Sequence, residues 1–119
     1  MKDFRKLKVW EKAHQLTLAI YAATKNFPKD ELYGLVSQMR RAASSIPSNI
    51  AEGCGKSGDM DLARYMQIAA GSASELEYQL ILARDLCYLD AVLHEQLTNQ
   101  VTEVKRMLTT LIQTLKADR

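Results

Sequence analysis

The sequence contains few of the residues that end or bend secondary structure, since its 119 residues include only five glycines and two prolines. Few turns are therefore encoded, which favours a small number of long helices over many short strands. Two cysteines are too few for a disulfide framework, and Cys54 and Cys87 do not form a metal-binding motif. We expect both thiols to stay free in a reducing cytoplasm.

Long apolar runs and a strong net charge are also missing. No stretch approaches the roughly 18 apolar residues of a membrane span, and the start, MKDFRKLKVW, lacks the apolar run of a signal peptide. The net charge of +2 does not by itself indicate a nucleic-acid-binding protein. The charge is uneven, because residues 1–24 carry five basic and two acidic groups whereas residues 59–90 carry two and six. Length and an ordinary composition indicate a single domain over residues 1–119.

Apolar residues repeat at alternating steps of three and four positions in four segments, which is a heptad pattern. The pattern predicts helices over about residues 7–26, 29–53, 59–87 and 90–116. The apolar seam of the second helix starts at Leu32, and that of the third ends at Cys87. Long helices joined by short connections predict an all-α fold, an antiparallel up-and-down four-helix bundle.

The segment from Gln38 to Gly53, QMRRAASSIPSNIAEG, combines helical periodicity with small polar residues and Pro47. A proline inside a helix removes a backbone donor and crowds the carbonyl four residues earlier, which costs about 3 kcal/mol or bends the axis. Nearby serine and asparagine side chains can bond the freed backbone groups. We therefore expect a long helix that is bent at Pro47 and has a polar notch near the bend.

Three polar residues of this segment, Ser45, Asn49 and Glu52, follow at steps of four and three positions and share one helix face. Hydrogen-bonded to the third helix, this polar stripe would fix the register between helices or subunits. A binding pocket is the alternative. In the third helix, Gly71 costs roughly 1 kcal/mol of helix propensity relative to alanine. We expect that cost to allow a close approach by the backbone of the second helix.

The chain begins with a basic arm, whose positive residues are Lys2, Arg5, Lys6, Lys8 and Lys12. Such a cluster is usually solvated surface, but an oligomer repeats it into a collar of positive charge that can neutralise phosphates. Lys6, Lys8 and Lys12 are therefore candidate nucleic-acid contacts. Trp10 and Tyr21 lie off the apolar seam, so they belong either to a wide buried face or to a surface that meets another subunit.

Arg40 and Arg41 are adjacent, so their side chains point about 100° apart on a helix. One of them can form an ion pair with Glu52, Glu75 or Glu77, while the other faces solvent or a ligand. The alternative to a structural ion pair is contact with phosphate, which suits the planar fork of guanidinium donors. Both arginines are candidate nucleic-acid contacts.

No catalytic constellation is visible. The segment GCGKSG ends like a phosphate loop, but the upstream glycine of that motif would fall at Ile50, and a strand should precede it. A helix C-cap and turn explain these glycines. His14 and His94 have no partner at ligand spacing, and no serine has a nucleophile turn. We expect no enzyme, no metal and no cofactor.

Several blocks of residues occur in a combination typical of one family. They include Phe27-Pro28, Tyr33-Gly34-Leu35, Asn49-Ile50-Ala51-Glu52-Gly53, Gly71-Ser72 and Glu75-Leu76-Glu77. Over nearly its whole length, the chain resembles the small four-helix-bundle proteins first noticed as reading frames inside intervening sequences of large-subunit ribosomal RNA genes. The resemblance implies a bundle that assembles into a ring, typically a pentamer. One departure is Cys87, because the family commonly has glycine there in Leu-Gly-Tyr.

The chain is also similar to the accessory protein of diversity-generating retroelements, which forms such a ring and works with a reverse transcriptase and RNA. We therefore expect a non-catalytic, oligomeric protein that is RNA-associated or accessory. The alternative is a scaffold whose ring docks a partner enzyme such as a reverse transcriptase. Its candidate anchors are the aromatic residues off the seams, Trp10, Tyr21, Tyr33 and Tyr65. We do not expect a membrane to be a partner.

Overall fold

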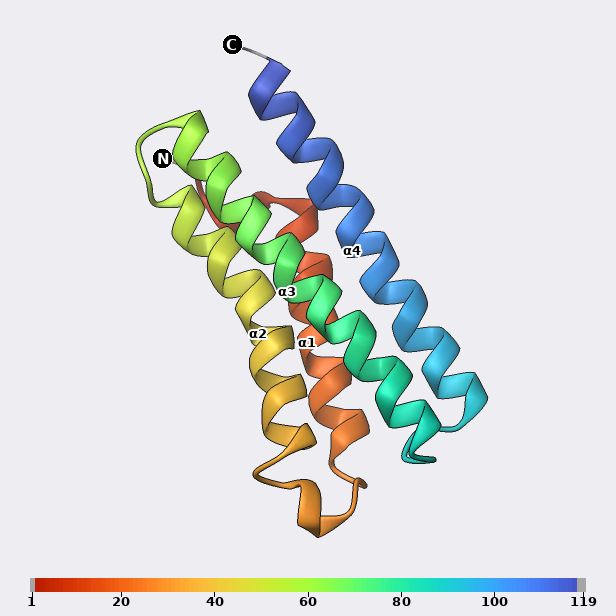
Figure 1. Ribbon diagram of the computed structural model, residues 1–119. Coiled ribbons are helices and arrows are strands. Elements are labelled where there is room, and N and C mark those ends of the chain that lie inside the picture. Colours follow the sequence, from red (N-terminus) through yellow and green to blue (C-terminus); the bar gives the residue numbers. More distant parts are fainter. Residues whose placement is uncertain (1, 118–119) are drawn as a thin grey trace.

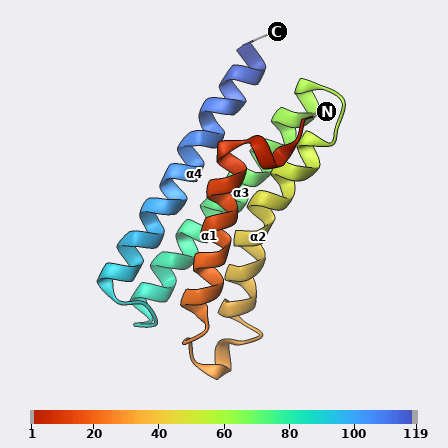
Figure 2. The ribbon, with the colours of Figure 1, turned by 180° about the vertical axis from the view of Figure 1, so that it is seen from behind.

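A computed structural model of the chain describes residues 2–117. Its long helices are α1 (Lys8–Thr24), α2 (Leu35–Cys54), α3 (Asp59–Asp85) and α4 (Ala91–Ala117). Two 3-10 turns, η1 (Phe4–Lys6) and η2 (Lys29–Glu31), precede α1 and α2. Consecutive helices pack together and α4 returns to α1, whereas the diagonal pairs have no Cα atoms within 8 Å in the described chain. The predicted up-and-down four-helix bundle is confirmed (Figures 1 and 2).

The predicted apolar seams form the core, which runs along the long axis of a body measuring 47 × 22 × 20 Å. The largest side chains with almost no exposed surface are Leu16, Ile20, Met39, Ile46, Ile50, Met66, Leu76, Leu80, Leu97, Val101, Val104 and Leu108. These residues belong to the apolar repeat from which the helices were predicted, because a heptad pattern keeps its apolar residues on one face of each helix.

The second helix begins later than predicted. Residues 29–31 form η2 and residues 32–34 form a turn, so the prediction of a helix from residue 29 was wrong. Leu32, predicted for the core seam, is 48% exposed. Glu31 explains the late start, because its Oε1 accepts a hydrogen bond of 3.2 Å from the Leu35 amide. A carboxylate at this place satisfies a free amide and the positive end of the helix dipole.

The third helix ends at Asp85, and the prediction that Cys87 lies in the core was wrong. Cys87 is exposed and has a φ of 65°, the left-handed region that favours glycine. Its amide donates to Arg84 O at 2.9 Å, and the Tyr88 amide donates to Ala83 O at 2.9 Å. This pair of bonds is the Schellman motif, whose C′ position is usually glycine. The motif explains why the family resemblance leads one to expect glycine here.

The close approach of α2 and α3 occurs at Gly53, and its prediction at Gly71 was wrong. A Cβ atom added to Gly71 would meet nothing within 4 Å in the described chain. A Cβ atom at Gly53 would lie only 2.8 Å from Tyr65 Cβ and 3.2 Å from Leu62 Cδ1. Gly53, in the last turn of α2, therefore provides the space for α3 that we expected at Gly71 from the sequence.

Pro47 is buried within α2, which continues through it as a helix. Because proline has no amide hydrogen, the carbonyl of Ala43 loses its partner within the helix. The hydroxyl of Thr17 in α1 lies 3.0 Å from Ala43 O and 2.9 Å from Ala13 O, so its one hydrogen is shared between the freed carbonyl and a carbonyl of its own helix. The freed carbonyl is thus satisfied from the neighbouring helix, and not by the serines or asparagine near Pro47.

Candidate nucleic-acid interface and partner surfaces

The predicted polar stripe is only partly a contact between α2 and α3. Ser45 Oγ lies 2.9 Å from Ser72 Oγ of α3, and Asn49 Nδ2 donates to Ser45 Oγ at 3.0 Å and to Ser45 O at 2.8 Å. These side chains are half-buried, so their hydrogen bonds fix how α2 and α3 face each other. Glu52 is exposed, and its side chain forms no hydrogen bond or ion pair within residues 2–117.

Arg41 pairs with one of the three acids considered for it. Its Nη2 lies 2.8 Å from Glu75 Oε2, and Gln79 Nε2 donates to the same oxygen at 3.3 Å. Gln79 is buried, and its Oε1 has no partner among the described residues. More than two-fifths of each charged side chain of the ion pair is exposed, so the pair contributes little stability. Its guanidinium stays accessible to a phosphate.

Arg40 is held by neutral groups at the end of α1. Its Nε donates to Thr24 Oγ1 at 2.9 Å, and its Nη2 donates to Tyr21 O at 3.3 Å. The guanidinium carbon lies 4.7 Å from the centre of the Tyr21 ring, which is a cation–π contact. No carboxylate lies within ion-pair distance of Arg40 in the described chain, so its charge is oriented but not neutralised.

Both arginines line a surface hollow of about 520 Å³ between the end of α1 and the start of α2. We call it the arginine–tyrosine hollow, and its lining residues are Tyr21, Leu32, Tyr33, Val36, Ser37, Arg40, Arg41 and Ser44. Tyr33 is 92% exposed and Tyr21 is 41% exposed. The hollow thus combines cationic, aromatic and hydroxyl groups, which no single sequence motif brings together.

The basic arm crosses the opposite end of the bundle, where the Lys2 amide donates to Cys54 O of α2 at 3.0 Å (Figure 2). Within the arm, Asp3 accepts hydrogen bonds from the backbone amide and the guanidinium of Arg5, which lower the pKa of its carboxyl group. Lys12 Nζ lies 3.7 Å from Glu103 Oε1 of α4. Lys6 and Lys8 are exposed and form no ion pair within residues 2–117.

Trp10 is half-buried and fixes the arm to α1. Its ring meets Phe4 edge-on at 5.0 Å between ring centres and stacks on His14 at 5.1 Å. Tyr21, in contrast, is held only at one face, by Arg40. The prediction that both residues contact another subunit stays a prediction.

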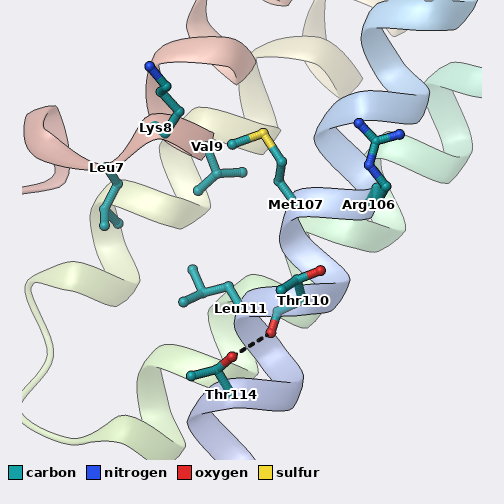
Figure 3. A pocket seen from close by; sticks show the side chains of 8 residues that line it. All are labelled: Leu7, Lys8, Val9, Arg106, Met107, Thr110, Leu111 and Thr114. Atoms are coloured by element: carbon teal, nitrogen blue, oxygen red, sulfur yellow. Dashed lines mark hydrogen bonds between the residues drawn. The ribbon is translucent and has the colours of Figure 1, made fainter.

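An apolar cleft of about 410 Å³ lies between the start of α1 and the C-terminal half of α4 (Figure 3). Leu7 and Val9 line one side, and Met107 of α4 reaches toward Val9 from the other side. Lys8 and Arg106 supply positive charge at its edges. This cleft could not be predicted from the sequence. Met107 continues the apolar face of α4, but the spacing of apolar residues does not tell whether α1 lies near enough to cover that face.

The chain matches the family described as 23S rRNA-intervening sequence protein over residues 5–110. It belongs to this family. The match includes all the candidate residues of the arm, the arginine–tyrosine hollow and the polar stripe, and it includes the apolar cleft up to Thr110.

A structural relative in the S23 ribosomal protein family supports the assignment. It is a crystal structure of a protein of unknown function from Bacteroides thetaiotaomicron, with 26% sequence identity and a TM-score of 0.79. The alignment covers 87% of this chain and 97% of the relative. No curated protein matches the chain.

Two further observations concern metal ions and membranes. Within residues 2–117, no group of three His, Cys, Asp or Glu side chains is placed to hold a metal ion. None of the described helices has an apolar stretch of the length and hydropathy needed to cross a membrane.

Proposed function

We propose that the chain forms a non-catalytic, oligomeric protein that associates with RNA. The observation that carries the proposal is the basic arm. Lys6 and Lys8 are exposed without an acidic partner in the described chain, and Arg106 adds positive charge across the cleft from Lys8. Charges that no carboxylate neutralises are available to phosphates. Contacts between such charges and phosphates supply most of the affinity in sequence-independent binding of nucleic acids.

Oligomerisation would place several copies of the basic arm in one assembly and so raise its affinity for RNA. A ring, which the family resemblance suggests is a pentamer, repeats the arm once in each subunit and lets several phosphates bind at the same time. Trp10 is a candidate contact between subunits, with part of its ring left open beside Phe4 and His14. We place this activity in the cytoplasm, where Cys54 and Cys87 stay reduced.

The test is binding of a fluorescently labelled RNA hairpin to the purified protein between about 50 and 200 mM salt. We expect affinity to fall steeply with salt, and a Lys6→Gln/Lys8→Gln variant to bind more weakly with a shallower salt dependence. The matched control is Lys25→Gln/Lys29→Gln, which removes two exposed lysines from the opposite end of the bundle. Absence of binding at low salt, or binding that Lys6→Gln/Lys8→Gln does not weaken, contradicts the proposal.

The apolar cleft between α1 and α4 favours a second candidate function, a scaffold that docks a partner enzyme such as a reverse transcriptase. Its lining residues Val9, Met107 and Leu111 resemble the apolar centre of a protein interface, and Lys8 and Arg106 resemble its polar rim. Affinity capture with the wild-type protein and with Met107→Glu tests this candidate. A stoichiometric protein that only the wild type retains supports it, and recovery of no such protein argues against it.

A further inference from the structure

We propose that the arginine–tyrosine hollow binds unpaired nucleotides of an RNA strand, with a base stacked on Tyr33 and the backbone phosphate held by Arg40 and Arg41. This inference rests on the proposed association with RNA and names the form of RNA that the site accepts. The hollow lies at the C-terminal end of α1, and the basic arm lies at its N-terminal end. The two ends of this helix are about 25 Å apart, at a rise of 1.5 Å per residue.

The aromatic part of the hollow is unusually exposed. Tyr33 lies in the turn before α2 and exposes 92% of its surface, more than any other large apolar residue of the described chain. Leu32 beside it is 48% exposed, although leucine is normally buried in such a bundle. No packing within the described chain covers either side chain. A ring with free faces is what base stacking needs, and such stacking accepts every base.

The cationic part of the hollow is already organised for a phosphate. The hydrogen bonds from Arg40 to Thr24 and Tyr21 use its Nε and Nη2, and no described residue accepts a hydrogen bond from its Nη1. The stack on the Tyr21 ring fixes the plane of the guanidinium. Arg41 has an exposed ion pair with Glu75, which a phosphate can displace at little cost.

The same geometry disfavours a double helix. In a duplex the bases are stacked on each other, so an exposed tyrosine ring finds no free base face to cover. The phosphates of a duplex can reach the arginines, but stacking on the tyrosine ring no longer adds to the binding affinity. Ser37 and Ser44 add hydroxyl groups at the lining, which can bond phosphate or the ribose 2′-hydroxyl. The hollow therefore prefers single-stranded over double-stranded RNA.

The experiment compares a labelled oligouridylate with a labelled RNA duplex of the same length, by fluorescence anisotropy at one salt concentration. We expect Tyr33→Ala to weaken binding of the single strand about tenfold, since stacking on one aromatic ring contributes about 1–3 kcal/mol per base. Binding of the duplex should not change. Tyr33→Phe should behave like the wild type, because the ring carries the effect.

The matched control is Tyr78→Ala, which removes an exposed tyrosine (61%) of α3 that does not line the hollow. It should leave binding of both RNAs unchanged. Tyr33 makes no hydrogen bond within residues 2–117, so circular dichroism should show normal folding of the Tyr33 variants.

The outcomes separate this inference from the proposed function. If the wild type binds RNA but Tyr33→Ala does not change the preference for the single strand, the inference is wrong and the proposed function stands. If the wild type binds neither RNA, the proposed function itself fails. If Tyr33→Ala changes the oligomeric state in sedimentation equilibrium, a second copy of the chain covers the hollow, and the inference is overturned.

Discussion

The interface between α2 and α3 is closed, whereas the interface between α1 and α4 is open. Where α2 meets α3, Gly53 leaves no room for a methyl group beside Tyr65, and Ser45 and Ser72 touch at 2.9 Å. Where α1 meets α4, surface clefts of about 410 and 340 Å³ lie near its two ends. Among the described residues, only the Lys12–Glu103 ion pair, at 3.7 Å, bridges these two helices through charged groups.

Side-chain size differs between the closed interface and the larger cleft of the open one. Small residues on α2 and α3, among them Ala43, Ala69 and Ala73, let the backbones approach and bring polar side chains into contact. Met107 and Leu111 of α4 are larger and only half-buried, because α1 does not cover them. The closed interface therefore contributes stability, and the open one retains apolar surface for a partner.

The largest expected effect is at the closed interface. Gly53→Ala should destabilise the protein by about 2–3 kcal/mol, because the added methyl group forces apart two packed backbones. Gly71→Ala is the matched control, and it should stabilise the protein by up to about 1 kcal/mol, because this exposed helical glycine meets no neighbour. Urea denaturation measures both. Destabilisation by Gly71→Ala would show that another backbone approaches α3 at this position.

The second-largest expected loss of stability concerns the hydrogen bond from Thr17 of α1 to the backbone of α2. Thr17→Val keeps the side-chain shape but leaves Ala43 O without a hydrogen bond, which should cost about 1–2 kcal/mol in urea denaturation. Thr109→Val is the control, because the Thr109 hydroxyl is exposed and bonds only Lys105 O of its own helix. If the two variants lose equal stability, the bond from Thr17 does not compensate for Pro47.

A gain in stability is expected at the turn that joins the closed interface to α4. Cys87→Gly should stabilise the protein by about 1 kcal/mol, because glycine adopts a positive φ without steric cost. Cys87→Ala removes the thiol but keeps the Cβ atom, so it should leave the melting temperature nearly unchanged. If Cys87→Ala stabilises the protein as much as Cys87→Gly does, the positive φ at this position is not the cause of the gain.

The smallest effect is expected at the open interface. A double-mutant cycle of Lys12→Ala and Glu103→Ala should give a coupling energy of no more than about 0.5 kcal/mol, because both side chains are more than a third exposed. A coupling well above 1 kcal/mol would show that this ion pair holds α1 and α4 together.

The sequence predicted the bundle well because heptad spacing depends only on residue order. It placed Leu16, Met66 and Leu108 in the core. It also included Glu75 among three possible ion-pair partners for the two adjacent arginines, and Glu75 pairs with Arg41. It failed at Leu32, Gly71 and Cys87. In each case a local feature of the fold decided the outcome, namely the Glu31 cap, the face of α3 that meets α2, and the Schellman turn.

The candidate surfaces were only partly visible in the sequence. The basic arm could be found directly, because its lysines are close together in the chain. The arginine–tyrosine hollow could not, because it joins residues of α1, the turn before α2 and α2 itself. The hydroxyl of Thr17 was also missed, since its partner lies 26 positions away in the chain.

By itself, the sequence determined the helix content, the order of the helices and which face of each one is buried, because periodicity and turn residues act locally. Only the tertiary structure decided which interface is closed and which is open. That choice depends on the sizes of side chains that face each other from different helices, and residues distant in the chain compete for the same space only after the bundle has formed.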